Sequence, residues 1–234
     1  MIKKLVFLML FAITITSVDA QQLLTPSFTY SHKKPSFITL TDGKVIKGII
    51  DDVDRKKGLI EEVKIVDSLG TKHKLKAESI QYMYLPPSGY DNLTKAMDFM
   101  SDAQKWNDEK LDQDLLNQGY AYFENAKVQI KKTEMVLLMQ LLNPSFSKKV
   151  KVYHDPLADE TMSVGVGGVA VAGGDAKSYF IKVDDKTAYK LEKKEYKKEF
   201  PILWKDCDKV ITTYTEIKWS ELTKHIVDFS ECAQ

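Results

Sequence analysis

The densest group of acid and base side chains in this 234-residue chain lies between His154 and Glu160. His154 and Asp155 are adjacent, and Asp159 and Glu160 follow shortly after them. Paired carboxylates beside an imidazole can act as general acid and general base in a hydrolysis reaction. The same residue types are also typical of a solvated surface loop, which is the interpretation we favour. If the protein is a hydrolase, these four residues are its candidate acids and bases.

A second stretch that could have a chemical role is the glycine-rich run at residues 163–178, SVGVGGVAVAGGDAKS. It holds five of the eleven glycines. Residues 165–170 loosely match a dinucleotide-binding fingerprint, and residues 168–173 begin like a phosphate-binding P-loop. The P-loop match fails at Gly174, where the motif requires lysine. The fingerprint lacks its context, because a dinucleotide site needs a buried strand before the glycines and a helix after them. We therefore expect no cofactor here.

The glycine-rich run is better interpreted as a connection between two strands that pair, KKVKVYHD before it and SYFIKV after it. Its centre is too apolar for an ordinary linker, which leaves two alternatives. The run is either a glycine-thinned pair of strands packed against a neighbour, or a mobile tip that offers an apolar edge to a partner.

Metal-ligand spacing is not evident in the sequence. An EF-hand that starts at Asp52 would need an oxygen ligand at Lys56 and a glycine at Lys57. The four histidines are scattered, and there is no cluster of cysteine and histidine for zinc. We expect no metal and assign no catalytic residue, so the sequence favours a protein that is not an enzyme.

The first twenty residues have the order of a secretory signal peptide. Lys3 and Lys4 precede an apolar run at residues 5–15, and a small-residue site ends at Ala20. The run is shorter than the roughly 20 residues that span a bilayer, so we expect cleavage after Ala20 and no transmembrane span in the mature chain. The protein would then be periplasmic, outer-membrane-associated or secreted.

Charge excludes one class of partner. The chain has 34 basic and 33 acidic residues, and removal of residues 1–20 leaves 32 of each, because Lys3, Lys4 and Asp19 are lost. Arg55 is the only arginine. Nucleic-acid-binding proteins usually carry a basic face and use arginine to contact phosphate and guanine. A nucleic-acid partner is therefore not expected.

The two cysteines, Cys207 and Cys232, predict a disulfide. Each ends an apolar stripe at helical spacing, and two helices that pack these stripes together would bring both thiols to one end of the seam. The oxidising compartment implied by export permits the bond. The alternative is two separately buried free thiols. The stripes consist of Tyr196, Phe200, Leu203 and Cys207, and of Leu222, Ile226, Phe229 and Cys232.

The fold class expected from these patterns is α+β. Residues 21–87 read as a small curled antiparallel β-sheet or SH3-like barrel, because two β-branched runs flank the turn pair Asp42-Gly43 and three further strand-like runs follow. Those runs are at residues 59–67, 72–77 and 80–85.

The rest of the chain divides into three further segments. Residues 88–118 are predicted to be helical, because Leu93, Met97 and Met100 fall at helical spacing. Residues 119–192 are predicted to form further antiparallel strands with the glycine-rich connection at 163–178. Residues 193–234 are predicted to form a C-terminal helical pair.

Several of these segments resemble the uncharacterised exported proteins common in Bacteroidota, which are small β-rich proteins with a helical tail. The resemblance is carried by the signal peptide ending at Ala20-Gln21, by residues 43–50 and 80–82, by the paired runs 150–153 and 179–181, and by the tail at 205–207 and 226–229. It implies a compartment and an architecture, and no activity.

A weaker likeness is to Sm-like barrels, whose strands read similarly to ITLTDGKVIKGIIDDVD with the later Ile80-Gln81-Tyr82-Met83. It implies a small SH3-like barrel at the N-terminal end. The RNA binding of those proteins is not carried over, because the mature chain has no net positive charge.

Three functional hypotheses remain open. The first and favoured one is a non-enzymatic periplasmic or cell-surface module that binds a protein or an envelope component, for instance through an exposed strand edge. The second is an envelope or extracellular hydrolase. The third is a structural component of an outer-membrane or secretion assembly. The sequence does not predict the oligomeric state.

Overall fold

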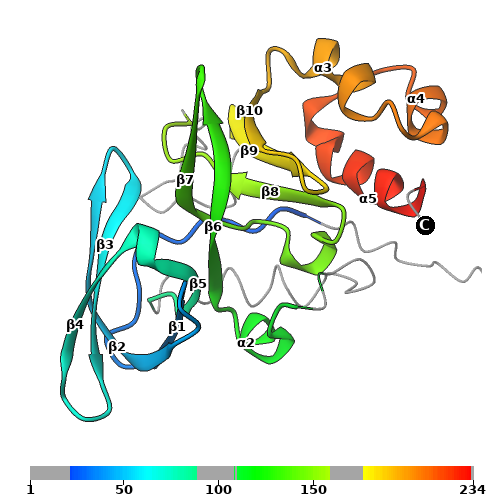
Figure 1. Ribbon diagram of the computed structural model, residues 1–234. Helices are drawn as coiled ribbons and strands as arrows, with labels where there is room; N and C mark the ends of the chain where they lie inside the picture. Colours follow the sequence, from blue (N-terminus) through cyan, green and yellow to red (C-terminus); the bar gives the residue numbers. More distant parts are fainter. Residues whose placement is uncertain (1–21, 89–107, 109, 159–175, 233–234) are drawn as a thin grey trace, which may run out of the picture.

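A computed structural model describes residues 22–88, 108, 110–158 and 176–232 of the chain (Figure 1). It shows a mixed α+β fold, in which one large open sheet of ten strands is followed by C-terminal helices. The strand order is β4-β3-β2-β1-β5-β6-β10-β9-β8, and β7 pairs with β6 outside this path. The strands are β1 (Ser36–Leu40), β2 (Val45–Lys56), β3 (Leu59–Asp67), β4 (Lys72–Lys76), β5 (Ile80–Leu85), β6 (Ala121–Ile130), β7 (Thr133–Gln140), β8 (Val150–His154), β9 (Ser178–Val183) and β10 (Ala188–Glu192).

The hairpin predicted around Asp42-Gly43 is confirmed. β1 and β2 pair antiparallel, Gly43 has the positive φ of +87° that the turn requires, and the Lys44 amide donates to the Asp42 side chain at 2.9 Å. The three further predicted strands of this region are present as β3, β4 and β5. The first five strands therefore form where the sequence places them.

The predicted N-terminal barrel is wrong, because the sheet does not close. β5 bonds to β1 on one side and continues to β6 on the other, and β4 lies at the end of the strand order. The backbone groups of β5 that would be needed to close a barrel against β4 are used by β6. The first five strands are thus one end of the larger sheet.

The second half of the sheet corrects another prediction, because it is not purely antiparallel. β6 and β10 pair in parallel, with Ala188 opposite Val128. The predicted pairing of the strands that flank the glycine-rich run is confirmed, since β8 and β9 are antiparallel neighbours with Val152 opposite Ile181. Residues 159–175 lie outside the described part of the chain, so both interpretations of the glycine-rich run stay predictions.

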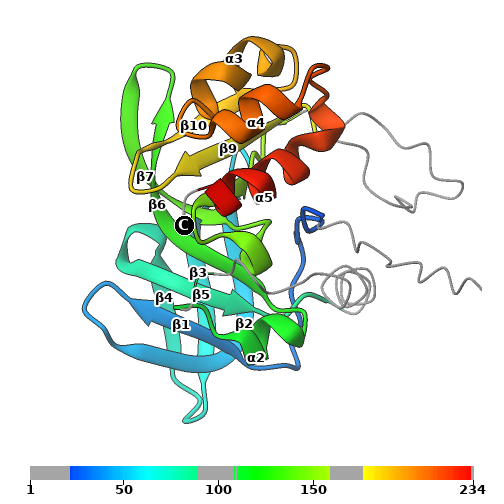
Figure 2. The same cartoon turned by 90° about the vertical axis from the view of Figure 1, so that its right-hand side faces the viewer.

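The C-terminal region contains three α-helices rather than the predicted pair. The stripe that starts at Tyr196 is interrupted, because α3 ends at Leu203 and a new helix starts after Cys207. Figure 2 shows these helices lying together against the β9–β10 hairpin. The helices are α2 (Gln113–Asn117), α3 (Tyr196–Leu203), α4 (Asp208–Thr213) and α5 (Leu222–Cys232), and the short 3-10 turns are Ala77–Ser79, Pro144–Phe146 and Trp219–Glu221.

Of the helical segment predicted over residues 88–118, α2 lies in the described part, and residues 89–107 and 109 lie outside it. The Asp112 side chain caps α2 by accepting from the Leu115 amide. No helix in the described ranges is long and apolar enough to cross a membrane.

The predicted disulfide between Cys207 and Cys232 is confirmed, with a Cα–Cα distance of 5.7 Å. It joins the residue before α4 to the last residue of α5. The predicted stripes pack as expected, because Phe200 and Ile226 are buried in one hydrophobic cluster with Ile181 of the sheet. The disulfide therefore closes the end of a helical layer that covers β8, β9 and β10.

Candidate functional site

Asp155, one of the predicted acid and base residues, makes structural contacts. Its side chain is 2 % exposed, and its Oδ2 accepts from the Ser178 hydroxyl at 2.8 Å and from Lys190 Nζ at 2.8 Å. Its Oδ1 accepts from the Leu157 amide at 3.0 Å. Oδ2 thus attaches the end of β8 to β9 and β10, Oδ1 holds the turn that follows, and the buried charge is balanced by lysine.

His154 contacts a different part of the protein. Its ring packs edge-to-face on Phe28 at 5.4 Å between centroids, and it lines a pocket beside Pro156. Neighbouring residues of an extended chain direct their side chains to opposite sides, which separates His154 from Asp155. Asp159 and Glu160 lie outside the described residues. The two described members of the predicted group therefore do not share a site.

A cluster of charged residues that the sequence did not reveal connects β6 to β8. The Glu124 carboxylate accepts from Lys151 Nζ at 2.9 and 3.1 Å, from the Tyr153 hydroxyl at 2.6 Å and from the Tyr122 hydroxyl at 3.3 Å. Asp108 lies 3.5 Å from the same Lys151. No motif indicates this cluster, because Glu124 and Lys151 are 27 residues apart.

The electrostatics of the Glu124 cluster favour a structural role. Burial, and then the neighbouring Glu124 charge, raise the pKa of Tyr122 and Tyr153 far above the usual value for tyrosine, so both hydroxyls stay protonated. Each oxygen of Glu124 already accepts from two donors, which leaves little capacity to act as a base. A fully paired polar network of this kind rigidifies a fold. In the described ranges, no group of three or more histidine, cysteine, aspartate or glutamate residues is placed to hold a metal ion.

Within the described strands, the sheet has three places where a strand edge could meet another chain, and two of them are protected. β4 carries Lys72, Lys74 and Lys76, all exposed, and lysine on an edge strand opposes pairing with another strand. The outer edge of β8 is covered by the chain that follows β7. There the Leu142 amide donates to the Val152 carbonyl at 2.8 Å, and Asn143 bonds to backbone groups of β8.

The third edge, on β7, is open as far as the described residues show. β8 meets the β7 side of the sheet at the bridge between Leu141 and Tyr153, and Pro156, which has no backbone N–H, follows soon after. Along residues 133–137, β7 pairs only with β6 among the described strands. Met135 is 46 % exposed and Val136 is 55 % exposed. We refer to the outer edge of residues 133–137 as the free edge.

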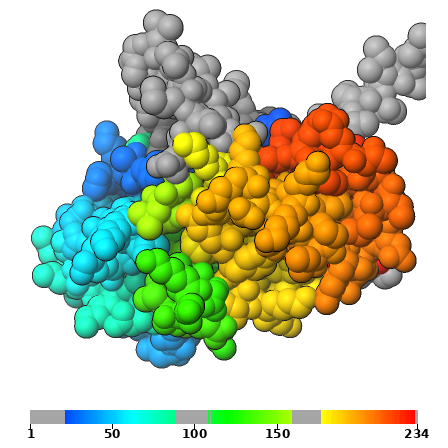
Figure 3. All heavy atoms as spheres, turned by 90° about the horizontal axis from the view of Figure 1, so that it is seen from above, coloured from blue at the N-terminus to red at the C-terminus, as the bar shows by residue number. Residues whose placement is uncertain are grey.

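The β6–β7 hairpin that carries the free edge projects from the sheet. In Figure 3 its end lies at the surface between the β2–β3 hairpin and the C-terminal elements. Its turn is at Lys131, which has a positive φ of 55°, and the exposed start of β7 follows directly. The hairpin therefore presents backbone groups where another polypeptide can reach them.

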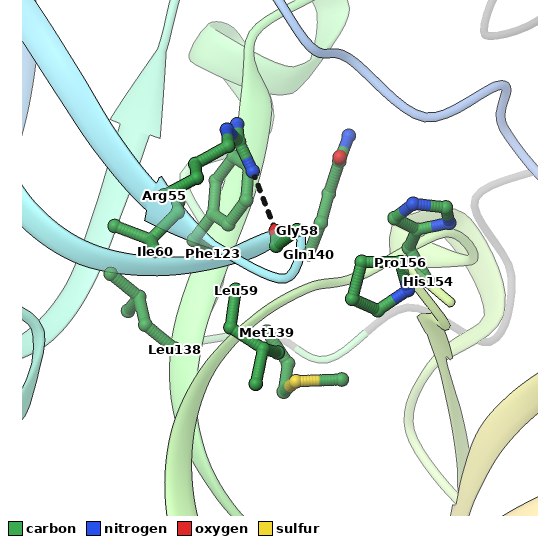
Figure 4. Close-up of a pocket in the computed structure, with 10 residues that line it drawn as sticks. All are labelled: Arg55, Gly58, Leu59, Ile60, Phe123, Leu138, Met139, Gln140, His154 and Pro156. Carbon is green, nitrogen blue, oxygen red and sulfur yellow. Dashed lines mark hydrogen bonds between the residues drawn. The ribbon is translucent and has the colours of Figure 1, made fainter. Parts of the chain in front are cut away.

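A small pocket lies where the free edge ends, and Figure 4 shows its lining residues. The turn between β2 and β3 closes one side of it. Lys57 and Gly58 both have positive φ, as in a tight hairpin turn, and Gly58 packs so closely on Pro156 that an added Cβ would lie 2.6 Å from the proline Cβ. The lining residues are Arg55, Gly58, Leu59, Ile60, Phe123, Leu138, Met139, Gln140, His154 and Pro156. We refer to this as the Arg55 pocket.

Fold and site together define an α+β protein with an open mixed sheet, a disulfide-closed helical layer and a strand edge on β7 that no other described strand covers. No family model, no curated protein and no solved structure matches the chain.

Proposed function

We propose that the protein is an exported interaction module that binds a partner polypeptide by adding a strand of the partner to the free edge of β7. The observation that carries the proposal is the contrast between the sheet edges. β4 is protected by lysines and β8 is covered by its own chain, whereas β7 exposes Met135 and Val136.

Strand addition uses the backbone for affinity and the side chains for selectivity. An edge strand presents unpaired N–H and C=O groups, and proteins normally protect such edges against unwanted pairing. Residues 133–137 extend over about 17 Å at about 3.4 Å per residue, which suits a segment of about five residues. Met135 and Val136 point to opposite faces, so the added strand would contact an apolar side chain on each face.

The disulfide supports the compartment assigned in this proposal. Disulfides persist in exported proteins and are rare in reducing compartments. The Cys207–Cys232 bond is buried at the Cys207 end, which is 2 % exposed. It agrees with the signal peptide expected from residues 1–20.

The test is a pair of matched substitutions. A photoreactive residue at position 135 first identifies the partner in the native cell, and the affinity of the purified pair is then measured by calorimetry. Val136→Lys places a charge on the free edge and is expected to weaken binding at least tenfold. Val45→Lys is the control, because Val45 is similarly exposed at 61 % but lies on β2.

One result would contradict strand addition at β7, namely that Val136→Lys and Val45→Lys bind the partner equally well. Equal loss of affinity in both variants would likewise mean that the free edge is not the binding surface.

A further inference from the structure

The Arg55 pocket lies at the C-terminal end of the free edge. Leu138, Met139 and Gln140 of β7 form one wall, and the turn at Gly58 together with Pro156 forms the closed end (Figure 4). Its free volume is about 20 Å³, which is room for one water molecule or one small polar group. Any larger ligand must leave most of its atoms outside the pocket.

Arg55 brings positive charge to this pocket. One guanidinium nitrogen donates to the Gly58 carbonyl at 3.3 Å, and the other terminal nitrogen donates to the Tyr30 hydroxyl at 2.9 Å. These bonds use two of the five N–H donors of a guanidinium. None of the ion pairs found among the described residues includes Arg55, and the lining residues contain no aspartate or glutamate.

Gln140 lines the pocket from β7 and is held in place, because its Oε1 accepts from the Ser27 amide at 3.1 Å. A guanidinium at a small opening, without an aspartate or glutamate among the lining residues, matches a ligand that only accepts hydrogen bonds.

We propose that the Arg55 pocket binds the C-terminal carboxylate of the segment that adds to β7. This inference rests on the proposed function, because the carboxylate is carried by the added strand. A planar guanidinium matches the two oxygens of a carboxylate, and such charge-assisted bonds are about twice as strong as neutral ones. The pocket is large enough for that group and for little else.

The chain direction follows from the shape of the edge. Gly58 and Pro156 pack against each other at the closed end, so an added strand cannot continue past the pocket and must end there. β7 itself runs toward the pocket, from Thr133 to Gln140. A segment that ends with its carboxyl group at Arg55 therefore runs parallel to β7.

The test compares two peptides on the mature, disulfide-bonded protein. The probes are N-acetylated Val-Thr-Val-Thr-Val with a free C-terminal carboxylate and the same peptide as its C-terminal amide. Binding is followed by NMR at the backbone amides of residues 133–137 and at the Arg55 side-chain N–H. The acid is expected to bind at least tenfold more tightly than the amide, and only the acid is expected to shift the Arg55 signal.

The same two peptides are also measured on the Arg55→Gln variant. Arg55→Gln is expected to lower the affinity for the acid at least tenfold, to the level of the amide, while affinity for the amide stays unchanged. The comparison of acid with amide on the wild-type protein does not depend on how well this variant folds. Sodium acetate and inorganic phosphate serve as small probes, and acetate is expected to shift the Arg55 signal at lower concentration than phosphate does.

The possible failures are distinguishable. Equal affinity for acid and amide, with shifts at residues 133–137, overturns the carboxylate pocket and leaves strand addition intact. Unchanged binding of the acid to Val136→Lys, with the Arg55 signal still shifted, supports the pocket and overturns strand addition. Preference for phosphate over acetate overturns the assignment of a carboxylate.

Discussion

His225 should make the stability of the protein depend on pH. The residue is 0 % exposed, and its Nδ1 lies 2.6 Å from the Tyr196 hydroxyl. That hydroxyl accepts from Trp204 Nε1 at 3.3 Å, which directs its own proton to Nδ1 and leaves His225 neutral. Burial lowers the pKa of His225 to about 4, a nearby Asp228 charge opposes the shift, and Lys224 adds to it.

The sign and size of the effect follow from this pKa. In the unfolded chain the histidine takes up a proton below about pH 6.5, whereas in the folded protein it stays neutral until about pH 4. The unfolded state therefore binds more protons in this window. The contribution is fully present above pH 6.5 and decreases as the pH falls, with a loss of about 2 kcal/mol at pH 5 and about 3 kcal/mol at pH 4.

The assay is urea unfolding of the wild-type protein and His225→Phe at pH 7, 5 and 4. Phenylalanine keeps an aromatic ring among Tyr196, Phe200 and Tyr214 but cannot titrate. Carboxylates contribute equally to the pH dependence of both proteins. The difference between the two free energies of unfolding therefore reports the titration of His225. The reasoning is refuted if that difference stays constant from pH 7 to pH 4.

Two further predictions concern stability. Gly48→Ala places a Cβ 2.2 Å from the Val66 carbonyl oxygen inside a paired strand, so it should lower the free energy of unfolding in urea by about 3 kcal/mol. Gly43→Ala is the control, because its Cβ meets no atom within 4 Å. It should lower the free energy of unfolding only by the roughly 1 kcal/mol that its positive φ costs. Equal losses would count against the close approach of β2 and β3. The Cys207–Cys232 disulfide closes a loop of 25 residues, so its reduction should lower the free energy of unfolding by roughly 3 to 4 kcal/mol in the chain-entropy model. An unchanged denaturation midpoint after reduction would contradict this stabilising role.

The local elements could be predicted because their signals are local. Asp42-Gly43 specifies a tight turn through backbone conformation, and β3 and β5 occur at the positions of their β-branched and alternating runs. The disulfide could be predicted for a related reason. Each cysteine ends an apolar stripe, so burial of the stripes determines where the thiols lie.

The open sheet could not be predicted in the same way. Whether β5 closes on β4 or continues to β6 depends on β6, which lies more than thirty residues further along the chain, and the sequence of β5 suits both arrangements. The parallel pairing of β6 with β10 could not be predicted for the same reason, because these two strands are also far apart in the sequence. The predicted C-terminal pair became three helices because α3 ends at Leu203, before its apolar stripe reaches Cys207, and α4 begins at Asp208.

The sites were the least predictable part. The sequence drew attention to His154 and Asp155 because they are adjacent, yet adjacency on an extended chain separates side chains. The Arg55 pocket combines residues from β2, β7 and the chain after β8, which no spacing in the sequence connects. The sequence signal for this pocket is that Arg55 is the only arginine, which argues against a nucleic-acid partner but does not indicate where Arg55 lies.

Amide hydrogen exchange of β7, in the complex with the partner identified through position 135, tests the central claim most directly. Strand addition predicts that exchange slows at least tenfold on binding at those residues of 133–137 whose N–H groups point away from β6, which are every second residue, because these groups become hydrogen-bonded. Unchanged exchange at these residues, with protection elsewhere on the protein, would contradict it.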